Sequence, residues 1–196
     1  MLKFSQTLVL CAVVAGLAGC ASSTPPERFA EMTFKHLPPV QLLVSDLKIE
    51  STATQSTEPP NIGHLFPTPP EAALRNWAGD RLVARGGPGT TARFTIVRAE
   101  AVGRTLNTDK GFTGLFKKEL SDRYEGFVDA VLTIYDANGQ RRAHIQAKAE
   151  HATTVREDAT LAERHKIMYE LVEKMMADFN AEMNRNIATH LRQYVM

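Results

Sequence analysis

The chain has 196 residues, enough for one domain with a single hydrophobic core. Its 23 lysines and arginines nearly balance 22 aspartates and glutamates, so no nucleic-acid partner is expected, because such a partner requires a concentrated basic surface. Both cysteines, Cys11 and Cys20, lie near the N-terminus. The rest of the chain therefore has no thiol for a disulfide, a metal site or nucleophilic catalysis.

The N-terminal segment has the parts of a secretory signal peptide. Lys3 precedes a short apolar series, and small residues follow it. The series is too short for a transmembrane helix, which needs about 20 apolar residues. A cysteine directly after Leu17-Ala18-Gly19 resembles the lipobox of bacterial lipoproteins. The resemblance implies that residues 1–19 are a lipoprotein signal peptide and that Cys20 is acylated as the first mature residue. An ordinary signal peptide with a chance cysteine is the alternative.

The residues after the signal suggest a location and a tether. By the same resemblance, Ala21 in place of an aspartate implies sorting to the outer membrane, with the domain held in the periplasm by its lipid anchor. Residues 20–37 mix serine, threonine, proline and charge without periodicity, which predicts a flexible tether. A single domain is then expected over residues 38–196.

The first part of this domain is expected to contain a strand and a helix. Alternating apolar and polar residues predict a strand over residues 40–49, with a bulge where the alternation changes phase. Residues 51–67 support no regular element and predict a long loop. Thr68 and Glu71 have the spacing of a capping box, and apolar residues then recur at helical spacing as far as Leu82.

A second strand and an insertion follow. Alternation over residues 92–101 again changes phase, which predicts another bulged strand. Within the insertion at residues 103–122, the apolar side chains of Phe112–Phe116 are flanked by lysines. They are expected to form either a lid on the core or a small contact surface for a membrane or a partner.

The next segment predicts a β-hairpin. Alternation over residues 124–134 and over residues 142–150 predicts two strands, and the turn at residues 136–139 ends in Asn-Gly, which is typical of a tight hairpin. One face of each strand is polar and the other is apolar, so the sheet should have one wet face and one dry face. Ala147 belongs to a row of alanines on the dry side and is expected to face a helix across a narrow gap.

A long helix is expected to close the chain. Thr160 and Glu163 form a second capping box pattern, and one apolar stripe continues through residues 161–194. Such a helix would be about 50 Å long, whereas a strand of about ten residues spans about 33 Å. The last turns should therefore project past the sheet, with core packing up to Phe179 and a possible partner surface from Met183 onward.

The predicted order, β-α-β-β-β-α, indicates an α+β fold in which two helices pack on one face of a four-stranded mixed sheet. The first two strands should be parallel, because a helix joins them by a right-handed crossover. With the lipobox, this order resembles the lipopolysaccharide-assembly lipoprotein of the outer membrane and the auxiliary lipoproteins of ABC-type lipid transporters. The stretch from Tyr124-Glu125-Gly126 to Arg164 is similar to uncharacterised proteobacterial lipoproteins.

The catalytic motifs that we sought are missing from the sequence. It has no Gly-x-Ser-x-Gly elbow and no His-Glu-x-x-His motif. His144 and His151 fall on opposite faces of one strand, so they cannot share a metal within it. We therefore expect no catalytic residues, no metal and no cofactor, and a protein that acts by binding as an accessory of envelope lipid or lipopolysaccharide transport or of outer-membrane assembly. The alternative is a periplasmic enzyme with a site in the loops around His64 and Phe112.

A candidate binding surface lies on the wet face of the predicted hairpin. Its donors are Arg141, Arg142, His144, Gln146 and Lys148. Three residues of the preceding strand, Glu125, Asp129 and Thr133, should lie beside them. The donors are expected either to meet an anionic lipid head group or an acidic partner, or to form cross-strand pairs on a solvated surface.

Overall fold

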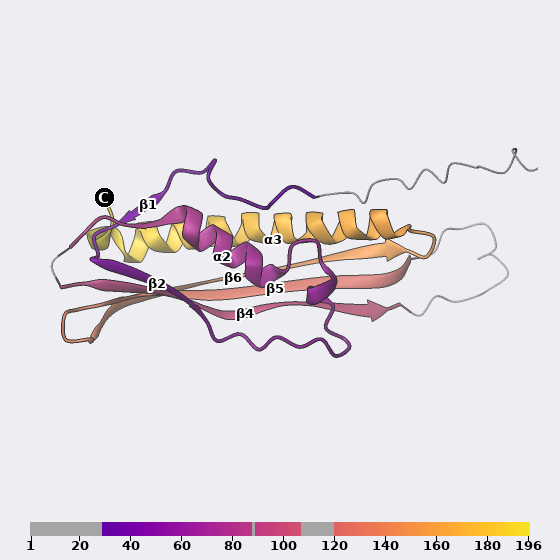
Figure 1. Ribbon diagram of the computed structural model, residues 1–196, viewed down its shortest axis with the longest axis horizontal. Helices are drawn as coiled ribbons and strands as arrows, with labels where there is room; N and C mark the ends of the chain where they lie inside the picture. The colour runs from indigo at the N-terminus through magenta and orange to yellow at the C-terminus, as the bar shows by residue number, and fades with distance from the viewer. Residues whose placement is uncertain (1–28, 88, 107–119) are drawn as a thin grey trace, which may run out of the picture.

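The computed structural model describes residues 29–87, 89–106 and 120–196 (Figure 1). Cys20, Ala21 and Phe112–Phe116 lie outside the described residues. The elements are β1 (Val40–Leu42), β2 (Asp46–Ser51), η1 (Gly63–Leu65), α2 (Pro70–Arg81), β3 (Leu82–Ala84), β4 (Thr91–Thr105), β5 (Leu120–Tyr135), β6 (Arg141–Arg156), α3 (Leu161–His190) and η3 (Arg192–Tyr194).

The main sheet has the strand order β2-β4-β5-β6. β2 and β4 are parallel, whereas β4, β5 and β6 form an antiparallel meander. α2 and α3 both lie on one face of this sheet (Figure 1). The predicted α+β fold, with two helices on a four-stranded mixed sheet, is confirmed. The bulge expected in the second strand is also present, as a register shift between Ile96 and Arg98 of β4.

The strand expected over residues 40–49 is two strands in two different sheets. β1 pairs in parallel with β3, which the sequence placed at the end of the first helix. Leu43 donates its amide hydrogen to the carbonyl of Tyr194 (2.8 Å), and Ser45 donates to the carbonyl of Thr90 (2.8 Å). The backbone thus changes partners between β1 and β2, and this change of sheet produces the phase shift in the sequence.

The two predicted helix starts have different outcomes. The prediction that Thr68 caps the first helix is wrong. α2 begins at Pro70, and its N-cap residue is Pro69, which makes no side-chain capping hydrogen bond. At the start of α3, Thr160 Oγ1 accepts from the Glu163 amide (3.2 Å) and Glu163 Oε2 accepts from the Thr160 amide (2.8 Å). The predicted capping box is therefore confirmed. The hydrogen bonds that the amide and the hydroxyl of Thr160 donate to the Glu163 carboxylate lower the pKa of Glu163.

The last turns of α3 were expected to project past the sheet, and this prediction is wrong. Met183 and Leu191 are fully buried, and Ile187 is 5% exposed. The expected strand length was too short: β5 and β6 each have 16 residues, which corresponds to about 53 Å. The sheet therefore supports α3 along its whole length, and Met183 is a core residue instead of part of a partner surface.

Replacing Ala147 by leucine should test the packing between β6 and α3. Ala147 is 1% exposed and lies opposite the fully buried Ala130. Extra methyl groups at this position should overpack the layer and cost about 1–3 kcal/mol of unfolding free energy. Ala152→Leu is a matched control on the same strand, because Ala152 is exposed. Equal melting temperatures for Ala147→Leu and the unmodified protein would contradict this packing.

Candidate functional site

The segment before β1, residues 29–37, is packed on the two helices, and we call it the strap. Asn76 Nδ2 donates to the carbonyl of Met32 (3.1 Å), and the amide of Phe34 donates to Asp80 Oδ2 (2.8 Å). Met32 and Phe34 are 6% and 7% exposed. The flexible tether was expected to reach Leu37, but from residue 29 onward the chain is held by hydrogen bonds and buried side chains.

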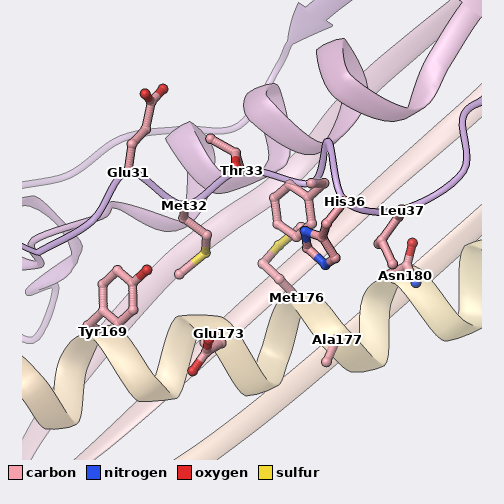
Figure 2. A pocket seen from close by; sticks show the side chains of 11 residues that line it. Glu31, Met32, Thr33, His36, Leu37, Tyr169, Glu173, Met176, Ala177 and Asn180 are labelled. Atoms are coloured by element: carbon pink, nitrogen blue, oxygen red, sulfur yellow. The ribbon is translucent and has the colours of Figure 1, made fainter.

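The outer end of the strap lies near the beginning of α3. The ring of Phe29 stacks on the ring of Tyr169 with 5.3 Å between centroids, and it meets His165 edge-on at 6.4 Å. Figure 2 shows the strap running between α2 and α3. The strap therefore forms one wall of a groove, and α3 forms the other.

A half-enclosed cavity of about 320 Å³ lies between these walls. Met32 from the strap and Met176 from α3 (Figure 2), together with Phe34 from the strap, supply buried apolar side chains to its lining. The volume is at the lower end of the range for small-molecule pockets, about 300–1,000 Å³. Methionine side chains adapt to irregular shapes, so this part of the cavity suits a flexible apolar group.

The remaining lining is polar and includes two carboxylates. Glu31 and Glu173 are exposed and make no ion pair with any described residue. His36 and Tyr169 also contribute to the lining, and Asn180 accepts a hydrogen bond from Trp77 Nε1 (3.0 Å). An apolar group with an uncharged or cationic polar end fits this lining better than an anion, because the carboxylates repel negative charge.

The predicted donors on the exposed sheet face are largely engaged within the sheet. Gln146 Nε2 donates to both oxygens of Asp129 (2.7 and 2.9 Å), and Lys148 Nζ lies 3.2 Å from Asp129 Oδ2. Arg142 lies 3.9 Å from Asp136. Thr133 lies opposite His144 in the register, as Asp129 does opposite Lys148. Cross-strand pairing thus accounts for much of this surface.

Two donors of the same set have no such partner. Within the described ranges, Arg141 and His144 make no ion pair or side-chain hydrogen bond, and both are exposed. Glu125 lies opposite Ala152 instead of beside the donors, and Arg123 and Arg104 approach it at 2.9 and 3.8 Å. Arg141 is therefore a positive charge without an ion pair among the described residues, and it lies at the end of β6 next to the hairpin turn, near the unengaged side chain of His144.

The loops proposed as an alternative enzyme site do not assemble one among the described residues. His64 lies in η1, is exposed and makes no hydrogen bond or ion pair there. Phe112 lies outside the described residues. In the part of the chain that the structure describes, no three histidine, cysteine or acidic residues gather in a way that could hold a metal ion.

Over the same described ranges, no helix has the length and apolar character needed to cross a membrane. No protein-family model matches the chain, and no curated protein matches its sequence.

Several solved structures have a low similarity to this chain. A minor lipoprotein from Acinetobacter baumannii has a TM-score of 0.39 and 14% identity, over 74% of this chain and 92% of that one. The rare lipoprotein B from Shewanella oneidensis has a TM-score of 0.39 and 8% identity, over 74% and 95% of the two chains. A lipoprotein from Caulobacter crescentus CB15 has a TM-score of 0.34 and 15% identity, over 72% and 88%. These similarities are too low to show a family for this chain.

Proposed function

We propose that this protein is an envelope lipoprotein, anchored through Cys20, that acts by binding the apolar chain of a lipid beneath the strap. In this role it would serve as an accessory of envelope lipid or lipopolysaccharide transport or of outer-membrane assembly. The observation that carries the proposal is the half-enclosed cavity between the strap and α3, with Met32, Phe34 and Met176 in its lining.

The position of the cavity supports a lipid as the ligand. The strap that forms its wall leads back towards Cys20, and the backbone from Cys20 to Phe29 spans at most about 30 Å. An acylated Cys20 would therefore keep the cavity close to a membrane surface, where acyl chains are abundant. The enzyme alternative has less support, because His64 is exposed and makes no hydrogen bond or ion pair with a carboxylate among the described residues.

Replacing Ala177 by phenylalanine should block the cavity and weaken lipid binding. Ala177 lines the cavity from an exposed position on α3, so a large ring fits there without disturbing the core. Trp77 is the only tryptophan of the chain and bonds to the lining residue Asn180. Its fluorescence can therefore report the entry of a brominated ligand. We expect bromoundecanol to quench it saturably, with an apparent Kd raised about tenfold or more in Ala177→Phe, since about 1.4 kcal/mol corresponds to a factor of ten.

The experiment uses the mature chain with Cys20 replaced by serine, so that no detergent competes for the site. Ala188→Phe is the matched control, because Ala188 is also exposed on α3 but does not line the cavity. Bromoundecanoic acid should bind more weakly than the alcohol, since Glu31 and Glu173 repel its carboxylate. Absence of quenching in the unsubstituted chain, or equal quenching in Ala177→Phe, would refute the proposal.

A further inference from the structure

β6 is an edge strand, and among the described residues no other strand pairs with its outer side. It is the last strand in the order β2-β4-β5-β6, has 16 residues and pairs with no second strand in the described residues. The carbonyl of Gln146 accepts a hydrogen bond from Asn186 Nδ2 (2.7 Å), so it points away from β5. Because pairing alternates along an antiparallel ladder, the N–H and C=O groups of His144 and Lys148 also face the open side.

The hydrogen bond from Asn186 shows that a backbone carbonyl on this edge can accept a hydrogen bond from an amide outside the sheet. A side-chain amide from α3 reaches the carbonyl of Gln146 in the way that the backbone amide of an added strand would. Beside it lies an open groove of about 480 Å³, lined by Ala143, Ile145, Asn186 and His190 together with His144 and Gln146. The groove gives room for the side chains that an added strand would direct towards α3.

A second copy of this chain would bring its own α3 helix to the same edge. α3 packs mainly on β6 and less on β5. An antiparallel pairing of two β6 strands would set them about 4.8 Å apart and place both α3 helices on the same face beside the joined edges. Packed helices need about 8–10 Å between their axes. The edge therefore suits a single extended segment that carries no helix over it.

The charge of the edge indicates the chemistry of that segment. From Arg141 to Ala149, β6 contains two arginines, one lysine and one histidine but no carboxylate. Arg141 and His144 have no ion pair or side-chain hydrogen bond in the described part of the chain. Side chains of an added strand alternate between the two faces of the sheet, so acidic residues on the exposed face would lie beside Arg141, Arg142 and His144.

We propose that the open edge of β6 binds an extended, acidic segment of a partner protein by strand addition. In the segment, acidic residues alternate with small or apolar residues that enter the groove beside α3. This surface is separate from the cavity beneath the strap, and its occupant is a polypeptide instead of a lipid. Strand addition at β6 can therefore be tested independently of lipid binding.

The first test uses a capped octapeptide of alternating glutamate and valine as the probe. With the mature chain carrying Cys20→Ser, we expect binding with a Kd below about 1 mM. Hydrogen exchange should slow at the amides of His144 and Lys148, which point to the open edge. The same peptide with lysine in place of glutamate should bind at least about tenfold more weakly. Absence of binding, or unchanged exchange at these amides, would overturn the proposal.

A pair of variants then separates backbone pairing from side-chain contacts. Proline is tolerated on an edge strand where its nitrogen faces solvent, so His144→Pro should leave the β5–β6 ladder intact while removing a donor from the edge. We expect His144→Pro to abolish peptide binding and His144→Ala to bind within about threefold of the unsubstituted chain, because the alanine keeps the amide. Equal affinities of the two variants would overturn strand addition.

The double variant Arg141→Gln, Arg142→Gln tests the charge argument without altering the strand backbone. It should weaken binding of the glutamate peptide and reduce its dependence on salt concentration, because fewer charges attract the peptide. Binding and salt dependence equal to those of the unsubstituted chain would contradict an acidic occupant. If His144→Pro does not fold, this double variant still tests whether the edge of β6 binds an acidic segment.

Discussion

Replacing Trp77 by alanine should remove about 3–5 kcal/mol of unfolding free energy, the largest loss expected from any single substitution considered. The side chain of Trp77 is fully buried. Its ring lies 5.1 Å from the ring of Phe179 on α3 and 5.7 Å from that of Phe94 on β4, measured between centroids. Trp77 thus joins both helices to the sheet. The midpoint of urea unfolding should fall accordingly, since a domain has only about 5–15 kcal/mol in total.

Trp77→Phe separates the two contributions of this residue. The phenyl ring keeps contacts with Phe94 and Phe179, but Asn180 loses the donor that Trp77 Nε1 supplies. We therefore expect an intermediate loss of about 1–3 kcal/mol, from the smaller buried ring and from the lost hydrogen bond to a part-buried acceptor. A Trp77→Ala variant within about 1 kcal/mol of the unsubstituted protein would show that the helices are held to the sheet by other contacts.

The elements predicted best are those with strong local signals. In the β5–β6 hairpin, Asn138 and Gly139 lie in the turn as predicted, and Gly139 has a positive φ of 75°, whereas Asn138 does not have the positive φ of a two-residue Asn-Gly turn. At the start of α3, Thr160 and Glu163 lie three residues apart and cap each other. The residues that determine these elements are close in sequence, so a pattern of spacing reveals them.

The elements that were missed depend on partners far away in the chain. β1 has only three residues, too few for a periodic pattern, and it pairs with β3 through Val40 and Leu82. The strap is held by Asn76 and Asp80, more than forty residues away along the chain. Sequence patterns do not show such pairings.

The strap did leave a small signal in the sequence. Met32 and Phe34 are apolar residues two positions apart within a polar segment, and both prove to be buried. The serines, threonines and prolines before them favoured a flexible tether for the whole stretch. The cavity itself could not be predicted, because it exists only where the strap and α3 come together.

The candidate donors were placed on the correct face of β6, but their partners were only partly foreseen. Alternation put Gln146 and Lys148 on the exposed face, and both contact Asp129 as cross-strand pairing would predict. Nothing in the sequence indicated that Asp129 would be almost buried, at 8% exposure, and would engage both of them. Their availability for a ligand therefore depends on side-chain packing that periodicity does not encode.

Replacing Cys20 by serine should release the protein from the membrane, which is the largest change of location expected. Each buried methylene contributes about 0.8 kcal/mol to membrane binding, so two or three acyl chains hold a protein firmly. A chain without acyl groups has no such anchor. We expect Cys20→Ser in the soluble periplasmic fraction and the unsubstituted protein in the outer-membrane fraction of a sucrose gradient.

Cys11→Ser is the control for that experiment, because Cys11 precedes the expected cleavage site and should not affect anchoring. If Cys20→Ser stays with the membrane, the anchor is not the lipid on Cys20. If the unsubstituted protein fractionates with the inner membrane, the sorting expected from Ala21 is wrong.

Native mass spectrometry of the protein extracted from membranes tests anchored lipid binding most directly. We expect the mass of the chain from Cys20 with its covalent acyl groups, together with one lipid that dissociates on activation. That additional lipid should be lost in Ala177→Phe and retained in Ala188→Phe. A spectrum with no dissociable lipid on the unsubstituted protein, or with the same lipid on Ala177→Phe, would contradict lipid binding beneath the strap.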